Sequence, residues 1–157
     1  MPNTLRRATN ADGPAAAALV AAALVEFGLQ PDPTGTDADL ADIERHYFAR
    51  GGDFVVLIAP DARLVGTCGL YPLASPSPGA IELRKMYLAP LTRGQGQGRR
   101  LLEWAIQRSR ELGYRQLRLE TACVLKDAIA LYERNGFLRD NRALHTCRCD
   151  AAFVREL

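Results

Sequence analysis

Apolar positions along the chain alternate between short β-rich runs and one long stretch with helical spacing. Runs at 54–59 and 64–71 flank the turn residues Pro60 and Asp61, a pattern that predicts a β-hairpin. Residues 96–112 instead predict an amphipathic helix, whose apolar stripe consists of Leu101, Leu102, Ala105, Ile106 and Leu112.

The remaining elements are predicted from β-rich runs, caps and turn residues. Strands are expected at 4–7, 81–88 and 116–120, and in the tail from Phe137, best at 146–155. Helices are expected at 9–27, opened by a capping box of Thr9 and Asp12, at 37–49, ended by Gly51 and Gly52, and at 126–134. Loops rich in Pro or Gly occupy 30–36 and 72–79. This order predicts an α/β protein with a mixed sheet, helices on both faces and a single domain over residues 1–157.

The composition is that of a soluble globular protein. Of the 157 residues, 48% are hydrophobic and 24% are charged, and the formal net charge is +2. So small a charge argues against nucleic acid or an acidic membrane as a partner, and any anion must be bound by a local cluster. The cysteines show no CxxC pair and no zinc-type spacing, which indicates free thiols and no metal site; they are Cys68, Cys123, Cys147 and Cys149.

The N-terminal region superficially resembles a secretion signal. Arg6 and Arg7 precede an apolar run at 15–25, but this run is mostly alanine, and Glu26 and Phe27 follow where small residues belong. The run is also too short to cross a bilayer. A buried alanine-rich helix explains it better, so we expect a cytoplasmic protein that does not enter the membrane.

The clearest chemistry lies in a glycine-rich loop between a predicted strand and the helix at 96–112. The loop consists of Arg93, Gly94, Gln95, Gly96, Gln97, Gly98 and Arg99. Alternate glycines let a ligand approach the main chain, and the first amides of a helix point outward at the positive end of its dipole. This arrangement predicts an anion site suited to a diphosphate, with Arg93, Arg99 and Arg100 adding positive charge.

Other interpretations of this loop fit less well. A nucleotide P-loop fails because no Gly-Lys-Ser/Thr follows. A dinucleotide fingerprint counted from Gly94 has Arg99 in place of its third glycine, although Glu120 lies near the position of a ribose-binding acid. A purely structural turn is less attractive because three alternate glycines cost conformational entropy.

The spacing Arg93-x-x-Gly96-x-Gly98 resembles the pyrophosphate-binding motif of the GCN5-related N-acetyltransferase (GNAT) family. Residues 131–137, Leu-Tyr-Glu-Arg-Asn-Gly-Phe, are similar to the family's LYExxGF motif, and the order of elements agrees over essentially the whole chain. The resemblance implies a splayed, mostly antiparallel sheet of about seven strands flanked by about four helices. It also implies acetyl-coenzyme A (acetyl-CoA) as the cosubstrate.

The resemblance further implies roles for individual residues. The pantetheine arm of the cofactor would lie along Met86, Tyr87 and Leu88, and its diphosphate on the amides of Gly94 through Arg99. The thioester would lie where this strand diverges from the strand at 116–120. Tyr132 occupies the family's position for the acid that protonates the departing sulfur, with simple packing on the sheet as the alternative.

Glu82 is the candidate general base. On a regular strand it shares one face with Arg84, Met86 and Leu88, while the other face carries Ile81, Leu83, Lys85 and Tyr87. Charges on both faces are unusual within a sheet unless one face lines a cleft, and family members often use a glutamate in this strand, commonly through water. Ion pairing of Glu82 with Arg84 or a neighbouring strand is the open alternative. The amide of Met86 or Leu88 is the candidate oxyanion donor.

The expected reaction is direct attack of a primary amine on acetyl-CoA in a ternary complex. The acceptor would be a small molecule, an amino acid or a peptide; the alternative is a non-catalytic acyl-CoA sensor, and the presence of Tyr132 and Glu82 favours the enzyme. We expect the acceptor pocket near the loop 30–36 and residues 138–145, with His46 and Tyr71 as candidate lining residues. Nearby acids either attract a cationic amine or form a solvated face; they are Asp32, Asp37 and Asp39.

The chain departs from the family pattern in one place. Many relatives carry an asparagine early in the last helix, where this chain has Leu125, Lys126 and Asp127. The resemblance therefore gives little basis for assigning cofactor contacts to the residues of that turn. The family also allows a homodimer.

Overall fold

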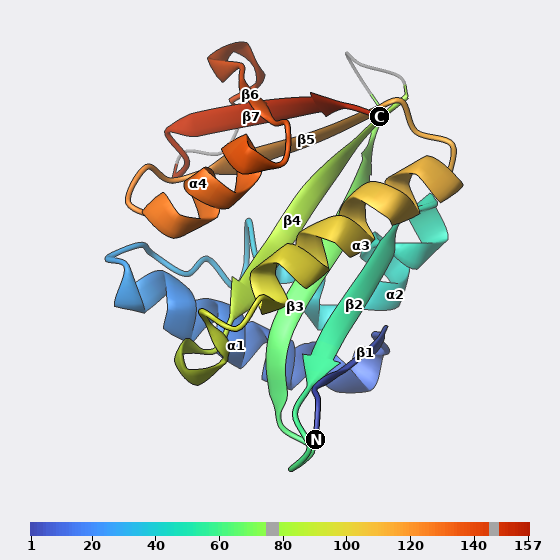
Figure 1. Ribbon diagram of the computed structural model, residues 1–157. Coiled ribbons are helices and arrows are strands. Elements are labelled where there is room, and N and C mark those ends of the chain that lie inside the picture. The colour runs from blue at the N-terminus through green and yellow to red at the C-terminus, as the bar shows by residue number, and fades with distance from the viewer. Residues whose placement is uncertain (75–78, 145–147) are drawn as a thin grey trace.

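The strands form one open sheet in the order β1-β2-β3-β4-β5-β7-β6 (Figure 1). The computed structural model describes residues 1–74, 79–144 and 148–157. Its strands are β1 (Thr4–Arg7), β2 (Asp53–Ile58), β3 (Leu64–Leu73), β4 (Ala80–Leu88), β5 (Gln116–Thr121), β6 (Leu138–Arg139) and β7 (Ala151–Glu156). Every neighbouring pair is antiparallel except β4 and β5. The predicted mixed, mostly antiparallel sheet is therefore confirmed.

Helices cover both faces of this sheet. They are α1 (Gly13–Glu26), α2 (Ile43–His46), α3 (Gln97–Glu111) and α4 (Lys126–Arg134). In Figure 1, α3 and α4 lie in front of the sheet and α1 and α2 behind it. Alternate side chains of β2 point to opposite faces and so join two different core clusters. Val55 packs in the cluster with α3 and α4, while Phe54 and Val56 pack in the cluster with α1.

Several predicted boundaries are confirmed. The hairpin of β2 and β3 forms, and α4 spans the predicted residues 126–134. The capping box of Thr9 and Asp12 is present, although it opens a short 3-10 turn, Asn10–Asp12, that precedes α1. The alanine-rich run at 15–25 lies within α1, as expected of a helix.

The prediction of one continuous helix at 37–49 is wrong. The segment forms a 3-10 turn at Ala38–Ala41, then α2, then a second 3-10 turn at Phe48–Arg50. Asp42 interrupts the helix because its φ is −148°, and its carboxylate accepts a hydrogen bond from the Arg45 amide at 3.1 Å. Asp42 therefore caps α2 rather than continuing a helix through it.

The last strand is shorter than the predicted 146–155. The carboxylate of Asp150 accepts a hydrogen bond from the Cys123 amide at 2.7 Å, and the Asp150 amide donates to the Thr121 carbonyl at 3.1 Å. These contacts fix residue 150 just before β7, which begins at Ala151. Residues 145–147, which include His145 and Cys147, lie outside the described residues.

β4 and β5 diverge after a short parallel pairing. The ladder joins residues 80–82 to residues 116–118, while β4 continues to Leu88 and β5 to Thr121. Among the described residues, no strand pairs with the β5-facing edge of β4 beyond Glu82. The main-chain groups along that edge are therefore available to a ligand.

A β-bulge at Lys85 decides which side chains of β4 share a face. Lys85 has φ 55°, the pairing with β3 shifts opposite it, and the Thr67 hydroxyl donates to the Lys85 carbonyl at 2.6 Å. The regular alternation predicted for this strand is therefore wrong beyond Arg84. The side chains that face α1 and α2 are Glu82, Arg84, Lys85 and Tyr87. Those that pack toward α3 and α4 are Ile81, Leu83, Met86 and Leu88.

Candidate active site

A cavity of about 1340 Å³ opens where β4 and β5 diverge. Its walls come from the end of α1, β4, the glycine-rich loop, the end of β5 and α4. Of the predicted site residues, those that line it are Glu82, Met86, Tyr87, Leu88, Arg93, Gly94, Gly96, Gly98, Arg99 and Tyr132. Gln95 and Gln97 are not among the lining residues, whereas the two candidate acceptor-side residues, His46 and Tyr71, are.

The glycine-rich loop enters α3 through two residues in the left-handed region. Gly94 has φ 72°, and Gly96, which caps α3, has φ 78°. A Cβ at either position would find no atom within 4 Å, so the loop backbone is open on that side. Because the first amides of α3 have no partner within the helix, this open backbone can bind an anion.

Arg93 ties the loop to its neighbours. Its Nη1 lies 2.5 Å from a carboxylate oxygen of Glu26 at the end of α1, and its Nε donates to the Leu88 carbonyl at 3.1 Å. Arg99 forms an exposed ion pair with Glu103 at 2.7 Å. Two of the three predicted cations therefore have anionic partners, and the third, Arg100, donates to the Asn3 carbonyl at 2.9 Å. The first amides of α3, in contrast, have no partner within the helix.

Tyr132 is buried at the edge of the cavity. Its ring packs against Phe137 and Phe153, with centroids 5.7 and 6.2 Å away. The residue is 6% exposed, and burial raises the pKa of its hydroxyl above the ordinary value. The hydroxyl is therefore protonated at neutral pH, as a proton donor must be.

Glu82 and Arg84 form an ion pair on the cavity wall. Nε of Arg84 donates to a carboxylate oxygen of Glu82, and the guanidinium stacks on Tyr71, 3.8 Å from the ring centroid. Burial disfavours the charge on Arg84, but the Glu82 carboxylate outweighs it and raises the pKa of the guanidinium. The ion pair expected as the alternative role of Glu82 is confirmed, and its role as a base stays a prediction.

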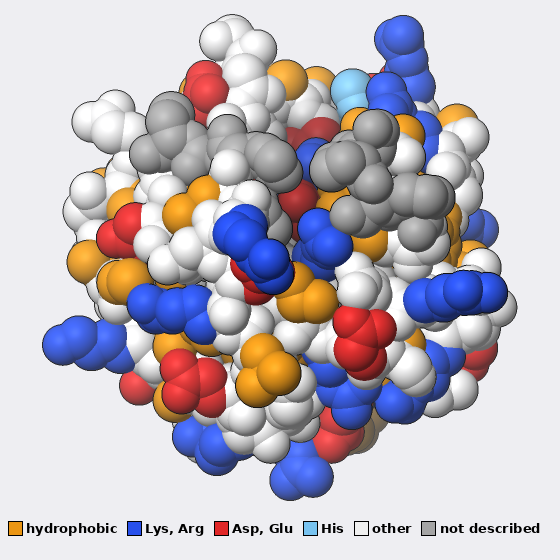
Figure 2. All heavy atoms as spheres, turned by 90° about the horizontal axis from the view of Figure 1, so that it is seen from above, with side chains coloured by type: hydrophobic (Ala, Val, Ile, Leu, Met, Phe, Trp, Pro, Cys, Tyr) orange, Lys and Arg blue, Asp and Glu red, His pale blue; other side chains and the backbone are white. Residues whose placement is uncertain are grey.

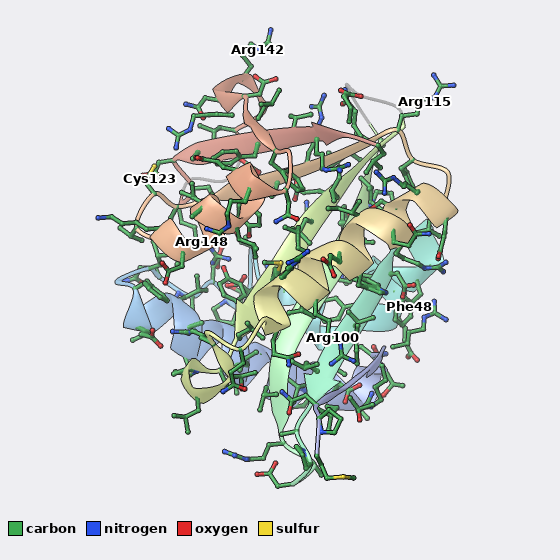
Figure 3. All side chains as sticks on the ribbon, in the orientation of Figure 1. Phe48, Arg100, Arg115, Cys123, Arg142 and Arg148 are labelled. Carbon is green, nitrogen blue, oxygen red and sulfur yellow. The ribbon has the colours of Figure 1, made fainter. Side chains whose placement is uncertain are left out.

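A buried ionic network that the sequence analysis missed lies on the α1 side of the cavity. The Lys85 ammonium donates to the Asp37 carboxylate at 2.7 Å and to the Thr36 carbonyl at 3.0 Å, and lies 3.6 Å from the Asp39 carboxylate. Arg148, seen below α4 in Figure 3, donates to both oxygens of Asp37 at 2.7 and 2.8 Å. Asp37 and Asp39 are thus neither solvated nor free to attract an amine; their partners are Lys85 and Arg148.

The network predicts stability that is lost in acid. Burial alone would raise the pKa of Asp37, but hydrogen bonds from Arg148 and Lys85 outweigh it and hold that pKa well below its usual range. The folded-state pKa is lower than the unfolded value of about 3.9, so this stabilisation is complete above about pH 5 and is lost as the pH falls below it. We expect Asp37→Asn to lower the free energy of unfolding at neutral pH, and the deficit to shrink in acid. Urea denaturation at several pH values measures this, and a pH-independent deficit would contradict it.

Comparison with known proteins decides the family. Residues 19–137 match the model described as "Acetyltransferase (GNAT) family". The chain belongs to the GNAT acetyltransferase family. It is 35% identical over 158 residues to the "Uncharacterized N-acetyltransferase YjgM" of Escherichia coli (strain K12), covering 98% of this chain and 94% of that protein. The predicted enzyme class, an acyltransferase, is confirmed.

Solved GNAT structures share the fold. An acetyltransferase of the GNAT family from Staphylococcus aureus Mu50 superposes with a TM-score of 0.90 at 22% identity, covering 98% of each chain. A GNAT phosphinothricin acetyltransferase from Sinorhizobium meliloti, solved in complex with AcCoA, gives a TM-score of 0.80 at 22% identity, covering 100% of this chain and 89% of that one. The splayed GNAT sheet predicted from the motifs is confirmed.

Metal-ligand groups and membrane-spanning helices are both absent from the described residues of this GNAT chain. The described residues contain no group of three or more His, Cys, Asp or Glu side chains placed to hold a metal ion. None of the described helices has the length and apolarity that spanning a bilayer requires. Figure 2 shows basic and acidic side chains interspersed over the face seen from above, in keeping with the net charge of +2.

The GNAT cavity also includes segments that the motifs did not mark. Glu120 and Thr121 at the end of β5 line it, as do Leu125, Lys126 and Asp127, where this chain departs from the family's asparagine. Glu120 and Thr121 end the strand that diverges from β4, and the other three follow it; this placement is the sequence signal that points to them. The start of α4 therefore borders the cavity through side chains of its own.

Proposed function

We propose that this protein transfers the acetyl group of acetyl-CoA to a primary amine of a small molecule, an amino acid or a peptide. The observation that carries the proposal is one cavity bordered by the open helix terminus of α3, the unpaired edge of β4, Glu82 and Tyr132. An anion site, a backbone edge and two titratable groups meet there. That combination matches the parts of a thioester cosubstrate and the proton transfers of acetyl transfer.

The cofactor would be held mainly by main-chain groups. The amides of Gly94 through Arg99 would bind the diphosphate, because a Cβ-free backbone at Gly94 and Gly96 leaves them accessible. The pantetheine amides would pair with β4 along Met86, Tyr87 and Leu88, on the edge that β5 leaves unpaired after residue 82. This mode of binding needs few specific side chains, which agrees with the partners already held by Arg93 and Arg99.

The chemistry proceeds by direct attack within the ternary complex. Glu82, directly or through water, accepts a proton from the acceptor ammonium, so that the neutral nitrogen can attack the thioester carbonyl carbon. The amide of Met86 or Leu88 donates a hydrogen bond to the developing oxyanion. The carbon–sulfur bond then breaks, and the departing sulfur takes the proton of the Tyr132 hydroxyl. The proton that the new amide nitrogen loses returns through water to the tyrosinate, which restores the hydroxyl.

The three cysteines that the structure describes favour direct attack over a covalent acyl-enzyme. Cys149 lines the cavity, and burial raises its pKa to about 11. The thiolate, which is the nucleophilic form, is therefore scarce at neutral pH. Cys68 is fully buried, and Cys123 does not line the cavity.

Replacing Gly96 with glutamate tests the cofactor site. The new carboxylate would be stabilised by the same helix terminus that would bind the diphosphate, so it would occupy the anion site and repel the ligand. We expect Gly96→Glu to weaken acetyl-CoA binding by about 100-fold or more, which is about 2.7 kcal/mol. Isothermal titration calorimetry measures the change directly.

Gly113→Glu is the matched control for this experiment. Gly113 has φ 88°, and its Cβ would also find nothing within 4 Å, but it follows the C-terminal end of α3. The backbone strain is thus similar in both variants, and only the loop variant should lose affinity. Equal losses of acetyl-CoA affinity in the two variants would show that the diphosphate does not bind at the loop. Binding without acetylation of any amine would identify an acyl-CoA sensor, and no binding by folded wild type would refute the proposal.

A further inference from the structure

Two of the cationic side chains on the α1 side of the cavity, Lys85 and Arg148, already have anionic partners within the protein. The Lys85 ammonium donates to the Thr36 carbonyl and the Asp37 carboxylate, and it lies 3.6 Å from the Asp39 carboxylate. Arg148 donates to both oxygens of Asp37 and, at 3.2 Å, to the Gln30 carbonyl. These two cations neutralise Asp37 and Asp39, the two buried acids of the network, so neither cation is free to bind a substrate anion.

Arg84 differs from these two cations because most of its donors are unused. Only its Nε has an acceptor among the described residues, the carboxylate of Glu82. Its side chain is 31% exposed and lines the cavity. The terminal nitrogens, which form the fork of the guanidinium, have no acceptor in the part of the chain that the structure describes.

The position of Arg84 is fixed although its terminal donors are free. Its guanidinium carbon lies over the Tyr71 ring, 3.8 Å from the centroid, and Tyr47 in turn packs edge-on against Tyr71 with ring centroids 5.7 Å apart. Tyr47 is fully buried, so this stack rests on the core of the protein. A guanidinium held in place loses little entropy on binding a ligand and can offer two parallel donors.

Two parallel N–H donors match a carboxylate or a phosphate. Glu82 decides between them, because its carboxylate contacts Arg84 and would repel a doubly charged phosphate. The pair of Glu82 and Arg84 is neutral as a whole, and its charges match a ligand that carries an ammonium and a carboxylate close together. If Glu82 receives the acceptor nitrogen, as in the proposed function, Arg84 lies beside the substituent next to that nitrogen.

We propose that Arg84 binds a carboxylate of the acceptor, and that the acceptor is therefore an amino acid whose reacting amine lies one or two carbons from that carboxylate. This inference rests on the proposed function and narrows its substrate class. Arg84 is then the residue that selects the acceptor. The free fork of Arg84, left open by its pairing through Nε, is the observation that supports this role.

The test compares each acceptor with its partner that lacks the carboxylate. Wild-type enzyme is assayed with acetyl-CoA on the common α- and β-amino acids, on the primary amines made by removing their carboxyl groups, and on simple polyamines. We expect kcat/KM to be at least 10-fold higher for the carboxylate-bearing member of each pair. Arg84→Gln should lower kcat/KM for that member by about 10- to 100-fold, the range for losing a hydrogen bond to a charged group, mostly through KM. The loss on the decarboxylated amines should be clearly smaller, because with those acceptors Arg84 acts only through its ion pair with Glu82.

Two further variants keep the test decisive. Arg50→Gln is the matched control, since Arg50 lies over the same Tyr71 ring at 5.3 Å but is exposed and does not line the cavity. It should leave the preference intact. Arg84→Lys keeps the charge without the fork, so it should lower the preference even if Arg84→Gln does not fold.

Each outcome separates this inference from the proposed function. Equal use of amines with and without the carboxylate, or equal losses on both classes in Arg84→Gln, would overturn the role of Arg84 while leaving an active acetyltransferase. Acetyl transfer to polyamines alone would likewise overturn the role of Arg84 but not the acetyltransferase activity. Acetyl-CoA binding without transfer to any amine would overturn the proposed function itself, and this inference with it.

Discussion

Replacing Tyr132 with phenylalanine is expected to lower kcat by about 100- to 1000-fold, within the range that general acid catalysis supplies. Phenylalanine fills the same space against Phe137 and Phe153 and removes only the hydroxyl, so the site keeps its shape. Burial raises the pKa of that hydroxyl, so it holds its proton through the neutral and mildly alkaline range. Without it, the coenzyme A thiolate must leave unprotonated.

Steady-state kinetics and calorimetry together test the role of Tyr132. The affinity for acetyl-CoA should be unchanged, because the proposed cofactor contacts come from the loop and from β4. Tyr114→Phe is the control, since that hydroxyl donates to the Gly51 carbonyl at 3.4 Å and does not line the cavity. A normal kcat in Tyr132→Phe would restrict Tyr132 to packing, the alternative that the sequence left open.

Replacing Lys85 with methionine is expected to lower the free energy of unfolding by about 3–5 kcal/mol, the cost of removing one partner from a buried ion pair. Methionine has a similar length, so the loss is mainly one of charge and hydrogen bonds. The carboxylate of Asp39 would lose its cationic partner and would be destabilised most. Its Oδ2 accepts from the Tyr47 hydroxyl, but its Oδ1 has no hydrogen-bond partner among the described residues, and Lys85 is its cation.

Chemical denaturation at neutral pH measures this loss. Lys126→Met is a matched control because Lys126 is exposed at the start of α4, and its removal should change stability by less than about 0.5 kcal/mol. The positive φ of Lys85 is common to wild type and variant, so it does not contribute to the difference. A loss below about 1 kcal/mol would show that Arg148, protonation or hydration compensates the acids without Lys85.

Local patterns were enough to find the anion loop and the last helix. Helical spacing predicts α3, and three alternate glycines predict an accessible backbone before it, because these are properties of a few neighbouring residues. The segment at 131–137 similarly predicted where α4 ends and where Tyr132 lies within it. The roles of Glu82, Tyr132 and the loop residues stay predictions until the kinetic and binding experiments are done.

Local patterns failed where one residue changed the geometry of an element. Asp42 was counted within a helix, but its side chain competes with the backbone and caps a new helix instead. The alternation of β4 was predicted as regular, but the bulge at Lys85 turns this side chain to the same face as Arg84. A period-two rule cannot foresee a bulge, because the bulge depends on the pairing with β3.

The sequence by itself determined the family, the order of elements and the position of the glycine-rich loop, since each is encoded in short stretches of chain. Only the tertiary structure decided which charged side chains on the α1 side of the cavity are paired with one another. Asp37 lies 48 positions from Lys85 and 111 positions from Arg148, yet all three form one buried network. Whether a charge is solvated, paired or free depends on which distant partners the fold brings within hydrogen-bonding distance. The same fold leaves Arg84, and not its neighbour Lys85, with donors to offer a substrate.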